Sequence, residues 1–170
     1  GRHKKIFPMF EFETKGNMED MIKLEEELLD FLGFEKDSVH CTYDGLSERY
    51  QTDILEAEHE ELMNKEISSK LFLKNFPKRT HPFWNMKEDT VRCIFNKVDV
   101  ILHGQETIGS AERSCDKDAM RWNFLNQTDG AYANLLFKKF GKERVMKELD
   151  EFLSHDFFPR FGGGIGMTRM

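Results

Sequence analysis

The sequence has only three cysteines, and their spacing is not that of a metal site or a disulfide framework. Cys41, Cys93 and Cys115 are odd in number, lie far apart and include no Cys-x-x-Cys pair, so neither a structural zinc site nor a disulfide-stapled fold is expected. The six histidines never form His-Glu-x-x-His. The closest segment, Glu58-His59-Glu60, is more typical of a solvated helix face, so zinc-dependent catalysis is not predicted.

Long apolar runs and an excess of positive charge are missing as well. No stretch approaches the ~20 apolar residues that a membrane span requires, and no charged and then apolar leader stands at the start. The formal net charge is -6, so no overall positive field draws the chain to nucleic acid, although RNA binding at a local surface stays open. We predict a cytoplasmic protein that does not associate with membranes.

Chain length and composition indicate one folded unit. The 170 residues suffice for a single core, and 39% hydrophobic with 33% charged residues is ordinary for a soluble domain. The sequence does not begin with methionine, and it stops just after a glycine-rich segment that contains an arginine. We therefore expect residues 1–170 to be one domain, or part of one, cut from a longer chain.

Aromatic and charged residues alternate near the start of the chain, which predicts a strand at residues 6–14. The alternation would place Phe10 and Phe12 together on one face of that strand. The other face would carry Phe7, Met9, Glu11 and Glu13. A half-exposed edge strand with solvated glutamates explains the same pattern equally well.

Later strands are predicted from apolar runs. Residues 98–102 form a nearly continuous run of branched apolar side chains, which is typical of a strand in the centre of a sheet. Residues 70–75 predict a strand that stops before Pro77. Residues 105–113 also have strand character, and the small side chains among them would leave space for a ligand.

Helical spacing of apolar residues predicts four helices, at residues 17–33, 53–66, 116–140 and 142–154. In the first of them, Asn17 is a plausible cap, Gly33 would end the helix, and the acidic side chains of Glu25, Glu26, Glu27 and Asp30 are expected largely on the outside. Because strands and helices from both halves of the chain mix, we predict an α+β fold in which an antiparallel β-sheet is flanked by α-helices.

The last nine residues combine closely spaced glycines with an arginine. Glycines allow the backbone to approach a ligand, and the planar guanidinium of Arg169 suits a phosphate, which together indicate a nucleotide. A Walker loop is excluded because Gly166 is followed by Met167, and a dinucleotide fingerprint would need a small residue at that position. A flexible glycine turn with a solvated arginine is the alternative interpretation of this segment.

These segments, taken in order, resemble the catalytic domain of class II aminoacyl-tRNA synthetases. The resemblance is carried by Arg2-His3, Phe7 and Glu11, by residues 106–113, and by residues 164–169. The residues from Arg2 to Glu13 are similar to the second half of motif two of that class, and the terminal glycines with Arg169 are similar to motif three. The resemblance implies that residues 1–170 are part of a single catalytic domain from which motif one and the upstream region are absent. Within the class, the sequence looks like the aspartyl and asparaginyl branch and the related ammonia-dependent asparagine synthetases.

The resemblance also implies a site for ATP and Mg²⁺. In that family pattern, Phe7 would stack on adenine, Glu106 would bind magnesium, and Arg169 would meet the terminal phosphate. Glu106 and Arg169 would be the catalytic residues. The full set of implied ATP-binding residues is Arg2, His3, Phe7, Glu106, Gly164, Gly166 and Arg169.

The amino-acid substrate would lie at the other end of this site. Arg113 corresponds to the arginine that grips a side-chain carboxylate, and Glu11 lies where the family places an acid near the ammonium group. The implied reaction is attack of an aspartate or asparagine carboxylate on the innermost phosphate of ATP, giving an aminoacyl-adenylate and pyrophosphate. Such a ligase needs positioning and charge neutralisation more than proton transfer.

Three functions remain open for the full-length protein, which the class predicts to be a homodimer. Gly109 stands where the asparaginyl enzymes often have glycine, which leans away from plain aspartyl-tRNA synthesis. Glu112 directly before Arg113, together with residues 163–166, looks closer to the asparagine synthetases, so the leading hypothesis is asparagine synthesis from aspartate and ammonia. An asparaginyl-tRNA or aspartyl-tRNA synthetase, with tRNA as the acceptor, is the main alternative. A non-catalytic paralogue that keeps the fold is the third hypothesis.

Overall fold

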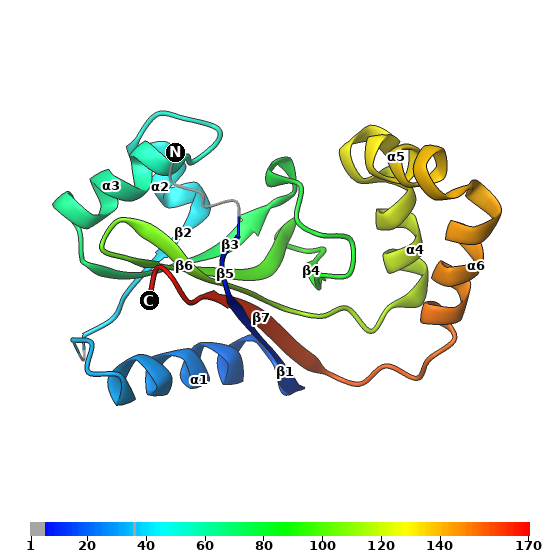
Figure 1. The fold of residues 1–170 in the computed structure, drawn as a ribbon. Helices are drawn as coiled ribbons and strands as arrows, with labels where there is room; N and C mark the ends of the chain where they lie inside the picture. The colour runs from blue at the N-terminus through cyan, green and yellow to red at the C-terminus, as the bar shows by residue number, and fades with distance from the viewer. Residues whose placement is uncertain (1–5, 36) are drawn as a thin grey trace.

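A β-sheet with helices on both faces forms the frame of the molecule (Figure 1). The computed structural model describes residues 6–35 and 37–170. In the described chain the sheet has seven strands in the order β1-β7-β6-β5-β3-β2, with β4 paired to β5. The strands are β1 Met9–Lys15, β2 Val39–Thr42, β3 Lys70–Pro77, β4 Glu88–Asp89, β5 Ile94–Leu102, β6 Gln105–Glu112 and β7 Arg160–Gly166.

The helices form three groups around this sheet. Figure 1 shows α1 on one side of the sheet, α2 and α3 on the other, and α4, α5 and α6 as a bundle beside it. The α-helices are α1 Met18–Phe31, α2 Tyr43–Arg49, α3 Ala57–Glu66, α4 Lys117–Asn126, α5 Ala131–Phe140 and α6 Lys142–Leu153, and two short 3-10 turns are η1 Lys78–Thr80 and η2 Gln127–Gly130. None of the helices in the described ranges is long and apolar enough to cross a membrane.

The predicted α+β class and the flanked sheet are confirmed, with one departure from antiparallel order. All strand pairs are antiparallel except β2 and β3, which run parallel. Helices α2 and α3 lie between these two strands in the sequence, which gives the long crossover that a parallel pair requires. Residues 98–102 lie in β5, in the middle of the sheet as predicted, and Val98 and Val100 are fully buried.

Two helical predictions were wrong in extent. The segment 53–66 contains only α3, while the sequence before it forms β2 and α2, which the pattern had not revealed. The segment 116–140 is broken at η2, where Thr128 and Asp129 have φ angles of 50° and 54°. Gly130 follows with φ 82°, so the chain turns there before α5 begins.

The outward placement of Glu25 was also wrong, although the ends of α1 were predicted well. Asn17 caps the helix through the backbone N–H groups of Glu19 and Asp20, and Gly33 follows its end with φ 87°. Glu25, however, is only 1% exposed, because it lies four residues after Met21 and four before Leu29 on the stripe that faces the sheet. Burial, opposed by the Ser110 hydroxyl and aided by the negative charge of Asp99, raises the pKa of the Glu25 carboxyl from 4.5 to about 8.

This buried acid makes the stability of the protein depend on pH. The carboxyl stays protonated up to about pH 8 in the folded state but ionises near its ordinary pKa of 4.5 when unfolded. The unfolded state therefore binds fewer protons across that window, and stability falls as pH rises through it. We expect Glu25→Gln to match the wild type near pH 5 and to exceed its stability at pH 9 by on the order of a few kcal/mol.

Thermal unfolding of the full-length protein at the two pH values tests this expectation. Glu27→Gln on the exposed side of the same helix is the matched control and should change little at either pH. An equal difference between Glu25→Gln and the wild type at both pH values would show that the acid is not held protonated.

Candidate active-site cavity

One row of paired residues crosses four strands of the sheet and joins distant parts of the sequence. Glu11 of β1 is opposite Gly164 of β7, Gly164 is opposite Gly109 of β6, and Gly109 is opposite Asp99 of β5. Residues directly opposite one another project to the same face of a sheet. The row therefore has a carboxylate at each end and two glycines in the middle.

The two glycines leave a hollow between the acidic ends. A Cβ atom on Gly109 would lie 2.9 Å from Glu106 Oε1 and 3.5 Å from Asp99 Oδ1. A Cβ on Gly164 would lie 2.9 Å from Met9 Sδ. The resulting cavity has a volume of about 510 Å³ and is lined by Met9, Glu11, Phe12, Glu13, Glu106, Gly109, Arg113, Gly163 and Gly164.

Glu106, which lines the cavity, and Asp99, which lies beside Gly109 at the end of the row, form an acidic pair. Asp99 Oδ2 accepts a hydrogen bond from Lys97 Nζ at 2.5 Å, while Asp99 Oδ1 is buried with no hydrogen-bond partner among the described residues. Burial raises the pKa of Glu106 to about 7; the charges of Asp99 and Glu60 raise it too, whereas those of Lys97 and Arg169 lower it. Both carboxylates are partly removed from water, and Asp99 Oδ1 accepts no hydrogen bond from the described residues. The pair therefore favours the binding of a positive charge.

This pair fits a magnesium ion better than a metal held by protein alone. No cluster of three or more His, Cys, Asp or Glu side chains that could hold a metal occurs within residues 6–35 and 37–170. Mg²⁺ is usually bound by one or two carboxylates and completes its shell with water and substrate phosphates. The donor set of Asp99 and Glu106 matches that requirement.

Arg169 lies beside the same acidic pair. A tight turn after β7 is closed by a hydrogen bond of 2.8 Å from the Arg169 N–H to the carbonyl of Gly166. The turn brings Arg169 Nη1 to 2.6 Å from the backbone carbonyl oxygen of Glu106, to which it donates a hydrogen bond. The end of the chain and the start of β6 therefore meet at one place.

The opposite end of the cavity is a network of two arginines around one glutamate. Arg113 Nε donates to Glu13 Oε1 at 3.3 Å, and Arg113 Nη2 donates to Glu13 Oε2 at 3.3 Å. Arg160 Nε lies 3.4 Å from Glu13 Oε1, so the glutamate is shared between the two guanidinium groups. Planar guanidinium and carboxylate groups at a cavity wall can recognise a ligand that carries both donors and acceptors.

Most residues expected at the site from the sequence lie around this cavity. Glu11, Glu106, Arg113 and Gly164 line it, and Gly166 shapes the turn that carries Arg169. Phe7 is outside the lining; it precedes Pro8, whose carbonyl accepts a hydrogen bond of 3.2 Å from the N–H of Met167 in that turn. Arg2 and His3 lie outside the described residues.

Sequence reasoning missed Asp99 and the role of Glu13. Asp99 lies within the apolar run at residues 98–102, which predicts a buried strand and no site residue. A single carboxylate among branched apolar side chains was the signal that could have marked Asp99 as a functional residue. Glu13 lines the cavity together with Glu11, as the alternation of β1 predicts, while its contact with Arg113 joins residues 100 positions apart. Only the pairing of the strands shows that contact.

The whole chain matches one family model, described as tRNA synthetases class II (D, K and N), over residues 2–170. The chain therefore belongs to the class II tRNA synthetase family. Members of this family are ligases that form aminoacyl-adenylates, and class II synthetases in general use ATP and Mg²⁺. No curated protein matched the sequence.

Solved structures of synthetases share the fold. An aspartyl-tRNA synthetase from Entamoeba histolytica has a TM-score of 0.74 at 20% identity, covering 99% of this chain and 40% of that one. An asparaginyl-tRNA synthetase from Pyrococcus horikoshii, solved with asparaginyl-adenylate, has a TM-score of 0.73 at 20% identity, with 99% and 44% covered. The asparaginyl-tRNA synthetase of Entamoeba histolytica, also with asparaginyl-adenylate, has a TM-score of 0.76 at 18% identity, with 99% and 44% covered. The chain thus spans less than half of each of these proteins.

Proposed function

We propose that the full-length protein uses this cavity to activate aspartate or asparagine with ATP, forming an aminoacyl-adenylate and pyrophosphate. The observation that carries the proposal is the row from Glu11 to Asp99, which opens one cavity between an acidic pair and an arginine network. Membership of a family of adenylate-forming ligases supports the same reaction. The nucleotide would lie at the end of the cavity near the acidic pair, and the amino acid would lie at the end near Arg113.

At the nucleotide end, the acidic pair and Arg169 would hold the phosphates. Asp99 and Glu106 would bind the magnesium ion, which supplies positive charge against the phosphate oxygens. Arg169, fixed on the carbonyl of Glu106, would add a guanidinium at the same place. Gly164 and Gly166 would allow close approach of the backbone, and Phe7 would stack on the adenine ring, with Arg2 and His3 near the triphosphate.

At the amino-acid end, charge and hydrogen-bonding geometry would select the substrate. Arg113 would donate to an oxygen of the substrate side chain, and Glu13 could accept a hydrogen bond from an amide group beside it. Glu11, at the end of the paired row, would face the ammonium group. No side chain has to act as a nucleophile, because the reaction depends on positioning and charge neutralisation.

Two acceptors for the adenylate follow from different observations. The family and the synthetases that share the fold favour tRNA, which would make the protein an asparaginyl-tRNA or aspartyl-tRNA synthetase. Glu112, directly before Arg113, favours ammonia, which would make the protein an asparagine synthetase. With either acceptor we expect the full-length protein to be a homodimer, as its class implies.

Exchange of radiolabelled pyrophosphate into ATP tests the activation step. The full-length protein should catalyse this exchange only when aspartate or asparagine is present, because the amino acid is one of the two reacting groups. Exchange that needs neither amino acid, or no exchange with both, would refute the proposal. Adding total tRNA or ammonia and analysing the products then identifies the acceptor.

Replacing Glu13 should alter the preference between the two amino acids. Glu13→Gln removes the negative charge between Arg113 and Arg160, so a negatively charged side chain is bound more favourably than a neutral amide. We expect the ratio of kcat/KM for aspartate to that for asparagine to rise by about tenfold, or about 1.4 kcal/mol. Glu13→Asp, which keeps the charge, is the control. An unchanged ratio, or a shift toward asparagine, would contradict the assignment.

A further inference from the structure

The part of β6 that carries Glu106 departs from regular strand pairing. Ile108 is opposite Val100 of β5, whereas Glu106 is opposite the very next residue of that strand. Thr107 is therefore an extra residue, and it forms a β-bulge. In a regular strand Glu106 would share the face of Ile108, which is buried in the core that includes residues of α1. The bulge instead turns the Glu106 carboxylate to the face of Gly109 and the cavity.

A bulge also loosens the ladder of hydrogen bonds, so the backbone of this segment needs other partners. The pairing of β6 with β7 runs from Ile108 to Glu112 and does not include Glu106. Two side chains from other elements bind the backbone there. The N–H of Glu106 donates to Glu60 Oε2 at 3.1 Å, and its carbonyl oxygen accepts from Arg169 Nη1 at 2.6 Å. Both backbone groups of a proposed metal ligand are therefore held by side chains.

Glu60 reaches Glu106 because α3 packs closely on the turn between β5 and β6 (Figure 1). Gly104 in that turn has a φ angle of 77°, a backbone conformation that favours glycine. A Cβ atom on Gly104 would lie 3.2 Å from Glu61 Cα and 3.4 Å from the carbonyl oxygen of Glu60. The absence of a side chain at Gly104 thus allows the backbone of α3 to come close to the turn.

The three residues Glu58-His59-Glu60 have different roles, although their sequence is typical of a solvated helix face. Glu58 is exposed. His59 Nδ1 accepts a hydrogen bond of 2.9 Å from the N–H of Glu56 and so helps to begin α3. Glu60 is half-buried and is directed to the bulge of β6. Glu60 therefore has a contact with the site that the composition of the segment does not reveal.

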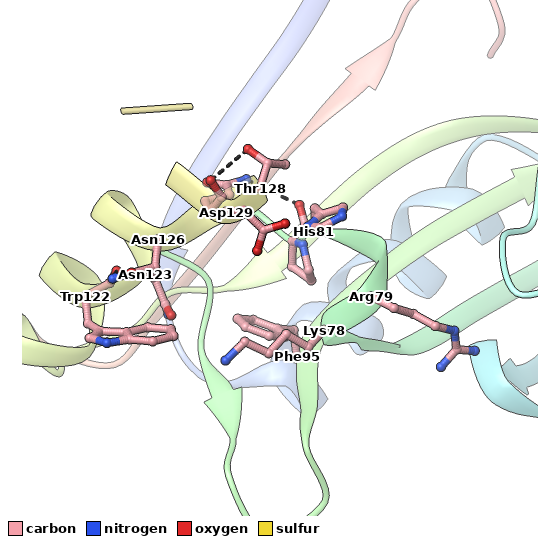
Figure 2. Close-up of a pocket in the computed structure, with 11 residues that line it drawn as sticks. Lys78, Arg79, His81, Phe95, Trp122, Asn123, Asn126, Thr128 and Asp129 are labelled. Atoms are coloured by element: carbon pink, nitrogen blue, oxygen red, sulfur yellow. Dashed lines mark hydrogen bonds between the residues drawn. The ribbon is translucent and has the colours of Figure 1, made fainter. Parts of the chain in front are cut away.

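In a larger hollow, of about 630 Å³ between η1 and α4, the polar groups are used within the fold itself (Figure 2). Asn126 Nδ2 donates to the carbonyl of Trp122 at 2.8 Å, and Lys78 Nζ lies 4.6 Å from the centroid of the Trp122 ring. Among the described residues, this hollow shares no lining residue with the active-site cavity. Glu60 differs from these groups because its partner is a residue of the proposed site.

From these contacts we propose that Glu60 is a positioning residue of the metal site, which holds the bulge of β6 so that the Glu106 carboxylate faces Asp99 and a magnesium ion. The inference rests on the part of the proposed function that places magnesium at the acidic pair. Loss of a hydrogen bond that orients a metal ligand typically lowers metal affinity or activity by about 10- to 100-fold. Helix α3 would therefore belong to the activation site, although the lining of the cavity includes none of its residues.

Direct binding of Mn²⁺, a paramagnetic substitute for Mg²⁺, to the full-length protein tests the inference without turnover. Electron paramagnetic resonance measures the free Mn²⁺ during a titration. Glu60→Ala should raise the dissociation constant by about tenfold or more. Glu60→Gln should stay within about threefold of the wild type, because its amide oxygen can still accept the hydrogen bond. Glu58→Ala, at an exposed position of the same helix, is the matched control and should bind Mn²⁺ like the wild type.

Gly104→Ala tests the same contact from the other side. Its Cβ atom would push α3 away from the turn, so it should weaken Mn²⁺ binding by a similar factor. Gly33→Ala is the matched control, because Gly33 also has a positive φ angle, of 87°, but a Cβ atom there would meet nothing within 4 Å. The control introduces the same kind of backbone strain and should leave Mn²⁺ binding unchanged.

Three results would overturn the inference. The first is wild-type affinity for Mn²⁺ in Glu60→Ala, and the second is a loss in Glu60→Gln as large as that in Glu60→Ala, which would assign the effect to charge. The third is a wild-type protein that binds no Mn²⁺, which would also remove the metal site. A wild-type protein that binds Mn²⁺ but does not exchange pyrophosphate would refute the activation reaction and leave the role of Glu60 at the metal site intact.

Discussion

Replacing either member of the acidic pair is expected to abolish nearly all adenylate formation. Asp99→Asn and Glu106→Gln keep the size of each side chain but remove the negative charge that would hold magnesium. Metal ions in such sites contribute several kcal/mol of charge stabilisation, so we expect the rate to fall by about a thousandfold or more. Folding should be preserved, because the substitutions relieve the repulsion between the carboxylates of buried Asp99 and half-buried Glu106.

Amino-acid-dependent pyrophosphate exchange, measured over a range of magnesium concentrations, provides the test. The variants should also need more magnesium to reach half of their residual rate. Glu58→Gln on the exposed surface of α3 is the matched control and should behave like the wild type. Rates within about tenfold of the wild type for both acidic-pair variants would show that Asp99 and Glu106 do not hold the metal.

The second large effect is expected at Arg113. Arg113→Ala removes the guanidinium that would contact the substrate side chain, and among the described residues it leaves Glu13 with Arg160 as its cationic partner. Loss of a charged hydrogen-bond partner costs roughly 2 to 5 kcal/mol, which corresponds to about thirtyfold or more in affinity. We therefore expect KM for the amino acid to rise by that factor, while KM for ATP changes less than about threefold.

A conservative variant separates the guanidinium geometry from its charge. Arg113→Lys keeps the positive charge but lacks the planar fork, so it should recover only part of the lost affinity. Isothermal titration with each ligand in turn measures the two affinities directly. Equal weakening of ATP and amino-acid binding in Arg113→Ala would contradict the placement of the amino acid at this end of the cavity.

The sequence predicted those parts of the fold that depend on local patterns. Residues 98–102 are a continuous apolar run, and the central strand β5 contains them. Glu25 was misplaced because three consecutive glutamates resemble a solvated face, whereas the spacing from Met21 to Leu29 decides which of them is buried. The break at η2 was missed because Thr128 does not usually adopt a left-handed backbone.

The site was predictable only where a motif lies close together in sequence. Glu106 and Arg113 stand in one strand segment, and Arg169 stands in the terminal glycine segment, so the family pattern was enough to select them. The partners of these residues depend on strand register. Asp99 reaches Glu106 across the turn between β5 and β6, and Glu13 reaches Arg113 through the pairing of β1, β7 and β6.

The central claim is that nucleotide and amino acid meet in the cavity between the acidic pair and the Arg113 network. A crystal structure of the full-length protein with a non-hydrolysable aspartyl-adenylate or asparaginyl-adenylate analogue tests it most directly. We predict that the side chain of the aminoacyl group contacts Arg113 and that the phosphate mimic lies beside Glu106 and Arg169. An analogue bound outside this cavity, or one that contacts neither Arg113 nor Glu106, would contradict the account.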